Sequence, residues 1–266
     1  MNNYHSHTTF CDGANTAEEM VLKAIKLGMD EIGFSGHSYL PFDDEWTMKP
    51  EEAKQYRETI KSLRDAYAER ISVRLGIEQD YCSPTDELSE YEYVIGGVHC
   101  LFKDDYYISV DLDRETQEKG IKEAYGGDVY AFVDDYFSTV ADIYNKTKCD
   151  IIAHFDLLSK YVEKGSVIDP DNERYKAAED RAIEALLKTP AVFEVNTGAM
   201  SRGYRTEPYP SLRILKKLAD AKAPVILSSD THSVETIDYG METAAKVCKD
   251  LGLTVIESID ELIKAK

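Results

Sequence analysis

Short apolar segments that suit β-strands alternate along this chain with segments whose apolar residues recur at helical spacing. The strand-like segments are the opening stretch around His5-Ser6-His7 and residues 31–35, 72–78, 93–99, 150–154, 191–196 and 224–230. Helices are predicted over residues 16–28, 50–69, 129–147, 172–187, 210–222 and 241–251, and a strand-like tail (254–256) and a short helix after Ser258 follow. Such an alternation of short apolar strands and helices is typical of a parallel sheet buried on both faces.

Two α/β architectures share this alternation, a closed (βα) barrel and an open doubly wound sheet. No Gly-x-Gly-x-x-Gly sequence follows the first strand, so a dinucleotide-binding open sheet loses support. The chain has 266 residues, a length at which α/β barrels commonly form one domain. Because the sequence contains no linker, low-complexity tract or internal repeat, we expect residues 1–266 to form a single domain.

The composition limits the partners and the compartment. The 50 acidic residues outnumber the 31 basic ones, and the net charge of −19 should repel nucleic acid and anionic membranes. The sequence has no apolar run long enough to span a bilayer and no basic-then-apolar start typical of a signal peptide. Its five scattered cysteines indicate reduced thiols rather than a disulfide framework. We therefore expect a cytoplasmic protein, and its oligomeric state stays open.

The six histidines share one position relative to the predicted strands. Each lies at the C-terminal end of a strand or in the loop just after it, and the six are His5, His7, His37, His99, His154 and His232. Three acidic residues, Asp12, Glu78 and Asp230, follow the same pattern. The C-terminal ends of the strands of a (βα) barrel converge on one face, where active sites lie. The sequence therefore predicts nine potential nitrogen and oxygen ligands at one rim.

These nine side chains suit a site for divalent cations. Imidazole and carboxylate groups bind Zn, Fe, Mn and similar ions. Nine ligands exceed the needs of one tetrahedral site and suffice for two or three ions with open positions for water and substrate. Two alternatives stay open, because His154 or His37 could orient a ligand instead of binding metal, and Asp12 could merely cap the turn before Gly13.

Six ordered motifs resemble the polymerase and histidinol phosphatase (PHP) superfamily of metal-dependent phosphoesterases. They are His-Ser-His-Thr at 5–8, Gly-Phe-Ser-Gly-His-Ser at 33–38, Gly-Ile-Glu at 76–78, Gly-Gly-Val-His at 96–99, Ala-His-Phe-Asp-Leu at 153–157 and Ser-Asp-Thr-His at 229–232. Four further motifs are similar to the histidinol-phosphatase branch, namely Tyr125-Gly126-Gly127-Asp128, Asp135-Tyr136, Glu194-Val195-Asn196-Thr197 and Glu207-Pro208-Tyr209-Pro210.

This resemblance implies a distorted seven-stranded (βα) TIM-like barrel with up to three divalent metal ions (Zn, Fe or Mn) at the C-terminal rim. It implies one ion held by His5, His7, Glu78 and Asp230. Glu78 would bridge to a second ion bound by His99 and His154, and Asp12, His37 and His232 would hold the third. The chain departs from the family pattern twice, with Asp12 where many members have histidine and Asn3 where aspartate is common.

The resemblance also implies an activity, the hydrolysis of L-histidinol phosphate to L-histidinol and phosphate in histidine biosynthesis. Divalent ions lower the pKa of bound water, so a hydroxide that bridges two ions can attack phosphorus. We expect Glu78, Asp230 and His232 to be catalytic, and the leaving oxygen takes its proton from a metal-bound water, His232 or Asp230. Alternatives are a PHP-type phosphatase for nucleotides or phosphotyrosine, an amidohydrolase-type metal hydrolase, and a domain whose metals are only structural.

Cationic and acidic side chains should complete a pocket for this small substrate. Three cations are candidates for phosphate, in the order Arg202, Lys160 and Arg205, because they follow strands at the same rim and suit phosphate oxygens. The imidazole and amine of the substrate need an acidic or aromatic partner, and the candidates are Asp104, Asp105, Trp46 and Tyr161.

Overall fold

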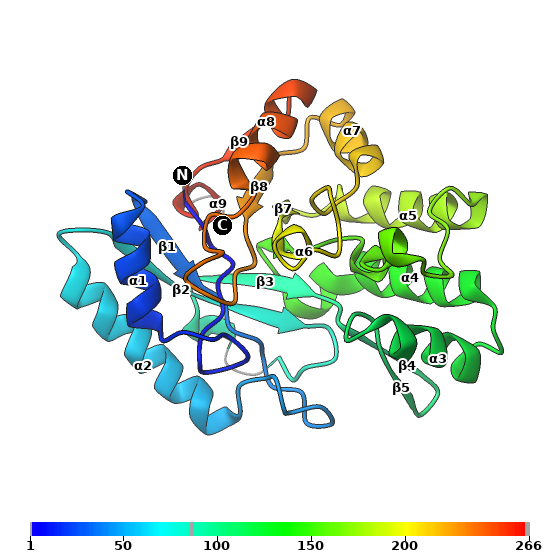
Figure 1. Cartoon of the computed structure of the whole chain (residues 1–266), viewed down its shortest axis with the longest axis horizontal. Coiled ribbons are helices and arrows are strands. Elements are labelled where there is room, and N and C mark those ends of the chain that lie inside the picture. Colours follow the sequence, from blue (N-terminus) through cyan, green and yellow to red (C-terminus); the bar gives the residue numbers. More distant parts are fainter. Residues whose placement is uncertain (1, 86–87, 264–266) are drawn as a thin grey trace.

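A seven-stranded parallel sheet forms the centre of the computed structural model, which describes residues 2–85 and 88–263 (Figure 1). Its strands are β1 (Glu31–Phe34), β2 (Ser72–Asp80), β3 (Tyr93–Gly97), β6 (Ile151–Ile152), β7 (Val192–Asn196), β8 (Val225–Ser228) and β9 (Val255–Ile256). The spatial order β1-β2-β3-β6-β7-β8-β9 follows the chain, and every neighbouring pair is parallel. This curled sheet confirms the predicted α/β fold of the TIM-like type.

The opening segment lies between β1 and β8, where a strand would close the ring. Asn3 forms a parallel bridge to Ile32 of β1, and Ser6 forms one to Thr231, just after β8. The His7 N–H donates to the Thr231 carbonyl at 2.8 Å. The segment therefore joins the two sides of the curled sheet and carries two of the predicted ligands.

This segment differs from our prediction of a regular first strand. The Asn3 side chain takes up backbone donors, because its Oδ1 accepts from the His5 N–H at 3.3 Å and from the Ser229 N–H at 3.2 Å. These side-chain hydrogen bonds replace some of the backbone hydrogen bonds of a regular strand. The segment therefore forms isolated β-bridges to its neighbours. The strand count of seven is correct because β9, in the predicted tail, is the seventh.

The predicted helices form within a few residues of their expected bounds. They are α1 (Ala17–Lys26), α2 (Pro50–Tyr67), α4 (Val129–Thr147), α5 (Glu173–Leu186), α7 (Leu212–Asp220), α8 (Met241–Leu251) and α9 (Asp260–Ile263). Thr16 and Glu19 form a capping box that fixes the start of α1. Helices α1, α2, α4 and α8 pack on β1, β2, β3 and β8. Within the described ranges, we find no helix with the length and apolarity needed to cross a bilayer.

The connection from β3 to α4 contains more structure than we predict. It holds an antiparallel hairpin of β4 (Cys100–Lys103) and β5 (Tyr106–Ser109), followed by α3 (Arg114–Ala124). The short helix α6 (Gly198–Ser201) and the 3₁₀ turns η1 (Leu88–Glu90), η2 (Leu157–Ser159) and η3 (Val162–Lys164) were also not predicted. Only Gln117, Gly120 and Ile121 of α3 are buried, so this helix lacks the apolar stripe that marks the others.

Tyr93 fills the barrel interior at the end away from the predicted ligands. It is the first residue of β3 and is fully buried, and its hydroxyl donates to the Tyr4 carbonyl at 2.6 Å. A Cβ atom on Gly76 would lie 2.2 Å from the Tyr93 ring, and one on Gly33 would lie 2.3 Å from its hydroxyl. Glycine at both positions thus makes room for the Tyr93 ring. The ring fills one end of the barrel interior, and the predicted ligands lie at the other, C-terminal end.

Candidate metal centre

The nine predicted ligands all lie at the C-terminal rim of the sheet. They come from the opening segment (His5, His7), the loop after it (Asp12), β2 (Glu78) and the loops after β1, β3, β6 and β8 (His37, His99, His154, Asp230 and His232). The structure brings them into overlapping groups whose nitrogen and oxygen atoms lie within a few ångströms of one another. Elements far apart in the sequence thus supply one cluster, as strand convergence predicts.

The Glu78 carboxylate lies among five imidazoles, and four of them approach it to 3.3 Å or less. Its Oε2 atom is 3.1 Å from His5 Nε2 and 2.9 Å from His37 Nδ1. Its Oε1 atom is 2.9 Å from His154 Nε2 and 3.3 Å from His99 Nε2. Burial would raise the pKa of this carboxyl, but the four imidazoles outweigh burial and hold the pKa well below its usual range. Glu78 therefore offers one ionised oxygen to each of two groups of histidines, as a bridging ligand does.

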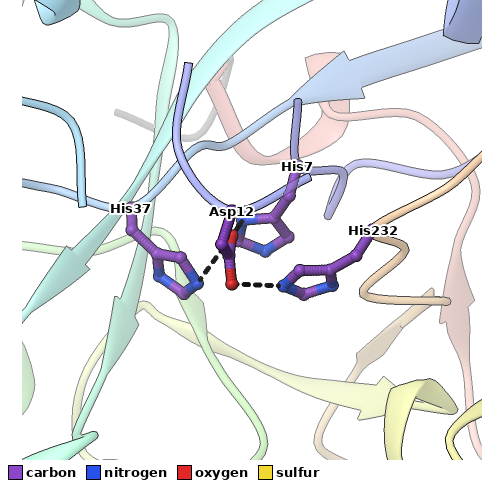
Figure 2. A group of neighbouring side chains, drawn as sticks. All are labelled: His7, Asp12, His37 and His232. Atoms are coloured by element: carbon purple, nitrogen blue, oxygen red, sulfur yellow. Dashed lines mark ion pairs between the residues drawn. The ribbon is translucent and has the colours of Figure 1, made fainter. Parts of the chain in front are cut away.

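Asp12 faces three imidazoles at the outer side of the cluster. Figure 2 shows its carboxylate between His7, His37 and His232, with Oδ2 at 3.1 Å from His232 Nε2. Its Oδ1 atom is 3.7 Å from both His7 Nδ1 and His37 Nε2. The local turn is closed by backbone bonds to the Thr8 carbonyl instead, at 2.9 and 3.1 Å. This geometry fits a ligand better than a turn cap.

Asp230 completes a third group with His5 and His7. Its Oδ1 atom lies 3.3 Å from His7 Nε2 and 3.7 Å from His5 Nε2, and its Oδ2 atom accepts from the Arg202 guanidinium at 3.1 Å. Asp230 has φ of 46°, in the left-handed region that L-residues rarely adopt. Backbone strain of about 1–3 kcal/mol at such a residue is characteristic of functional sites.

The cluster leaves buried polar atoms without hydrogen bonds, which tests whether metal ions fit there. Three such atoms that face the cluster are His5 Nε2, His7 Nε2 and Glu78 Oε2. Buried polar atoms are ordinarily hydrogen-bonded, so nitrogen and oxygen atoms that lie close together without such bonds are available to an ion. Burial together with His232 and His37 lowers the pKa of His7 to about 3, which keeps it in the neutral form that binds metal. The residues present therefore fit divalent cations of the Zn, Fe or Mn type.

Two carboxylates to which the sequence analysis gave no role orient these ligands. Glu194 on β7 lies with Oε1 2.6 Å from His5 Nδ1, and its Oε2 accepts from the His154 backbone N–H at 2.9 Å. Asp80 lies with Oδ2 3.1 Å from His99 Nδ1. Carboxylates that hold the second ring nitrogen of a histidine fix its orientation for metal binding. Asp80 could have been found, because it lies two residues beyond Glu78 on the same face of β2.

A cavity of about 580 Å³ opens over the cluster. Two of the predicted phosphate-binding cations line it, Arg202 and Lys160. The Arg202 guanidinium donates to the Asp230 carbonyl at 3.2 Å and lies 3.2 Å from His232 Nδ1. Lys160 donates to the Asp111 carboxylate at 2.9 Å. The structure thus places both cations beside the candidate ligands, each held by an aspartate.

Arg205 does not line this cavity. It packs over the Tyr209 ring at 4.3 Å and lies 3.6 Å from Asp156 Oδ2 in a separate hollow of about 80 Å³. Only three positions along an irregular loop separate it from Arg202, and sequence spacing does not give the direction of a loop side chain. We therefore leave Arg205 out of the candidate site, contrary to the sequence-based expectation.

The structure also changes the set of residues that could bind the amine and imidazole of the expected substrate. Of the four residues predicted, Trp46 lines the cavity, whereas Asp104 and Asp105 form the turn between β4 and β5. The Tyr161 hydroxyl donates to the Asp111 carbonyl instead. Three acidic residues that we did not predict, Asp43, Glu45 and Asp111, line the cavity with Trp46. The loop 41–46 therefore contributes a negative edge to the cavity above the candidate ligands.

Comparison with known families assigns this arrangement. A model of the PHP domain family matches residues 3–198, which hold the opening segment and seven of the nine candidate ligands. The chain belongs to the PHP domain family. Asp230 and His232 lie beyond the matched range, just after β8 at the same rim.

Relatives of this PHP chain match it over most of its length. A Deinococcus radiodurans protein named "Probable histidinol-phosphatase" is 26% identical over 93% of this chain and 92% of its own. The histidinol-phosphatase of Bacillus subtilis is 24% identical over 92% of this chain and 98% of its own.

Two solved structures share the fold. A Listeria monocytogenes protein assigned as a histidinol phosphatase superposes with a TM-score of 0.80 at 23% identity, over 91% of this chain and 99% of its own. The histidinol phosphate phosphatase of Lactococcus lactis, solved with Zn, L-histidinol and phosphate, superposes with a TM-score of 0.70 at 19% identity, over 96% of this chain and 95% of its own. Both likenesses support the PHP-type barrel described above.

Proposed function

We propose that this PHP chain is a metal-dependent phosphomonoesterase that hydrolyses L-histidinol phosphate to L-histidinol and phosphate. The observation that carries the proposal is one cavity that joins a largely buried cluster of nine potential ligands, two cations and an acidic edge. The names of the full-length relatives support the choice of substrate.

The candidate ligands would hold up to three divalent ions. His5, His7 and Asp230 would bind one ion together with Glu78, and Glu78 would share its second oxygen with His99 and His154. Asp12, His37 and His232 would bind the outer ion. When bound, such ions polarise phosphate oxygens and lower the pKa of coordinated water.

Arg202 is the side chain best placed to bind the phosphate. Its guanidinium is oriented by the Asp230 carbonyl and carboxylate and faces the cavity beside His232. A guanidinium presents several donors in one plane, which matches two phosphate oxygens and stabilises charge that develops on them. Lys160 adds positive charge from the same cavity.

The leaving oxygen would take its proton from a metal-bound water, or from His232 or Asp230 in a state in which that side chain is not coordinated to an ion. Both side chains line the cavity, and the His232 side chain is 27% exposed, whereas those of His5 and His7 are fully buried. The Arg202 guanidinium lies beside Nδ1 of the His232 ring, and the Asp12 carboxylate lies beside its Nε2. This pairing fixes the ring at the edge of the cavity, within reach of a bound ester.

The acidic edge supports a substrate with a cationic end. L-Histidinol phosphate carries an amine and an imidazole beside its phosphate, and Asp43 and Glu45 would attract both groups. The same carboxylates would repel a second phosphate, and Trp46 offers an aromatic ring for stacking. A cavity of about 580 Å³ suits a ligand of this size.

A panel of phosphomonoesters tests this assignment on metal-loaded enzyme. We expect kcat/KM for L-histidinol phosphate to exceed that for a nucleoside monophosphate, phosphotyrosine and p-nitrophenyl phosphate by on the order of 100-fold. The double variant Asp43→Asn/Glu45→Gln should lose most of this preference, while Glu51→Gln, an exposed neighbour outside the cavity, should keep it. Equal rates across the panel would contradict the proposed substrate.

We also propose that the chain is one PHP domain. The sheet extends from β1 to β9, and the opening segment pairs with both β1 and the residues after β8, so early and late parts of the chain share one core. The cytoplasmic location and the absence of nucleic-acid and membrane partners stay predictions that rest on the charge and on the cysteine pattern.

A further inference from the structure

Two thiols meet beside the candidate metal centre without belonging to it. Cys82 follows the end of β2 and Cys100 begins β4, and their sulfur atoms and a carboxylate oxygen of Asp80 all lie within 4.8 Å of one another. The Cys82 thiol donates to the Cys100 carbonyl at 3.7 Å, and the Cys100 thiol donates to Asp80 Oδ1 at 3.6 Å. Asp80 therefore stands between this pair and the rim.

Asp80 connects the thiol pair to a candidate ligand. Its Oδ1 atom also accepts from the Cys82 backbone N–H at 2.7 Å, so the turn after β2 and the Cys100 thiol share one carboxylate oxygen. Its Oδ2 atom accepts from the His99 backbone N–H at 2.9 Å and lies 3.1 Å from His99 Nδ1. Asp80 is thus the one side chain through which a chemical change at the thiols alters the contacts of His99.

We propose that Cys82 and Cys100 form a modification site at which a peroxide makes a reversible intramolecular disulfide. Cys82 is partly exposed and Cys100 is buried, so Cys82 reacts first. Its sulfur attacks the O–O bond of hydrogen peroxide to give a sulfenic acid and one water. The Cys100 sulfur then attacks the sulfenic sulfur, the S–O bond breaks, and the leaving hydroxide takes the Cys100 proton as a second water. In sum, two thiols are oxidised and one peroxide is reduced.

The disulfide would weaken the hold of Asp80 on His99. Oxidation removes the proton that Cys100 donates to Asp80 Oδ1 and pulls the Cys82 turn toward β4. Loss of a partner that orients a ligand histidine typically lowers metal affinity 10–100-fold. This consequence rests on the proposed metal centre, whereas the disulfide itself does not, so the two can fail separately.

The sequence around the pair makes the disulfide directly measurable. Trypsin releases one peptide, 75–103, that contains both Cys82 and Cys100 and no other cysteine. After treatment of the full chain with hydrogen peroxide, we expect this peptide to lose the mass of two hydrogen atoms and to regain it with dithiothreitol. Cleavage after glutamate, which occurs several times between the two cysteines, should leave two fragments that only the disulfide joins.

Matched variants and metal content complete the test. Cys82→Ser should abolish the mass loss, and Cys248→Ala, which removes a buried thiol of α8, should leave it unchanged. Metal-loaded protein should lose bound metal to a chelator faster when oxidised, and Cys82→Ser should not. The proposal is overturned if peptide 75–103 keeps both thiols, or if Cys82 goes on to the sulfinic acid without linking. A disulfide that leaves metal retention unchanged would overturn the coupling to His99.

Discussion

Glu194 binds two candidate ligands with different atoms of one carboxylate. It contacts the His5 ring with Oε1 and the His154 backbone with Oε2, and the Ser228 hydroxyl and the Asn196 amide also donate to it. Four partners leave it no freedom to move, so the orientation of His5 depends on its charge. A neutral amide at this position would weaken the grip on the imidazole.

We expect Glu194→Gln to lower metal affinity by about 10–100-fold, because an uncharged partner holds the ligand histidine less firmly. Competition with a chromogenic chelator measures this affinity without reference to turnover. Glu184→Gln, an exposed residue of α5, serves as the control and should behave like the wild type. Equal metal affinity in both variants would show that Glu194 does not support the metal centre.

Asp12 makes the sharpest test of the third ion. It is the only non-histidine ligand of its group, and its carboxylate lies between His7, His37 and His232. We expect Asp12→Ala to lower the bound metal by about one ion per chain and to reduce kcat together with it. Elemental analysis of the purified variant gives the count, and an unchanged count would return Asp12 to the role of a turn residue.

Asp111 carries a pH-dependent part of the stability. Burial would raise its pKa, but the Lys160 ammonium, helped by the imidazoles of His99 and His154, outweighs burial and lowers the pKa to about 2 from an ordinary 3.8. A carboxyl whose pKa falls on folding stabilises the folded state above the ordinary pKa, and this contribution disappears as the pH drops through the folded value. The gap corresponds to about 2 kcal/mol.

We therefore expect Asp111→Asn to lower the free energy of unfolding at pH 7 by about 2 kcal/mol. The difference from the wild type should shrink between pH 4 and pH 2, where Asp111 becomes protonated. Urea unfolding of the metal-free proteins at several pH values measures it, with the exposed Asp105→Asn as the control. A difference that stays constant with pH would contradict the ion pair as its source.

At the scale of elements, the β4–β5 hairpin supports the loop 41–46. Phe42 lies 4.8 Å from the Phe102 ring and 5.2 Å from the Tyr107 ring, in centroid distances, and the Tyr107 hydroxyl donates to Asp43. The loop that supplies the acidic edge is thus packed against aromatic side chains of a hairpin. Aromatic pairs of this type contribute about 0.5–1.5 kcal/mol each.

We expect Phe102→Ala to raise KM for L-histidinol phosphate several-fold while bound metal stays constant, because the loop loses its packing and the metal ligands do not. Steady-state kinetics together with metal analysis separates the two effects. Tyr239→Ala removes an equally exposed aromatic side chain outside the cavity and should change neither. A fall in metal content for Phe102→Ala would show that the hairpin supports the ligands as well.

The elements with strong periodicity were predictable, and those without it were not. The helix over 129–147 has the bounds we predict, because seven of its residues form a buried stripe and Asp128 caps its start. The β4–β5 hairpin was not predicted, because two acidic residues interrupt its apolar alternation and Asp104 has a positive φ of 52°. The opening segment pairs through the Asn3 side chain, which no periodicity reveals.

The ligand cluster was predictable for a different reason. Strand convergence is a property of the fold, so the position of each histidine relative to its strand end suffices to gather them. The partners of the ligands depend on tertiary contacts instead. Glu194 and the direction of Arg205 are of this kind, because their contacts come from residues tens of positions away.

For the whole molecule, the metal centre should contribute substantially to stability. Three carboxylates and six imidazoles gather at the rim, and several of their buried atoms lack hydrogen bonds. We expect a chelator to abolish phosphatase activity and to lower the melting temperature by on the order of 10 °C, because ions that bind only the folded chain add several kcal/mol.

Addition of Mn or Zn should restore both quantities, and calorimetry with parallel assays follows them. The Glu194→Gln variant should show a smaller shift in melting temperature at the same metal concentration. Activity that survives complete metal removal would exclude the proposed chemistry, whereas a stability effect without any activity would indicate metals that serve only the fold.

The contacts of the opening segment also determine at which stage of chain synthesis the complete ligand set can form. Asn3 pairs with Ser229, which lies 226 positions later in the chain. At 5–20 residues per second, the ribosome adds that length in roughly 10–45 seconds. Throughout that interval His5 and His7 have been synthesised but lack the Asp230 and Thr231 neighbours that hold them in place. A nascent chain that stops short of these residues therefore lacks the contacts that close the ring, and the complete ligand set forms only after they have been added.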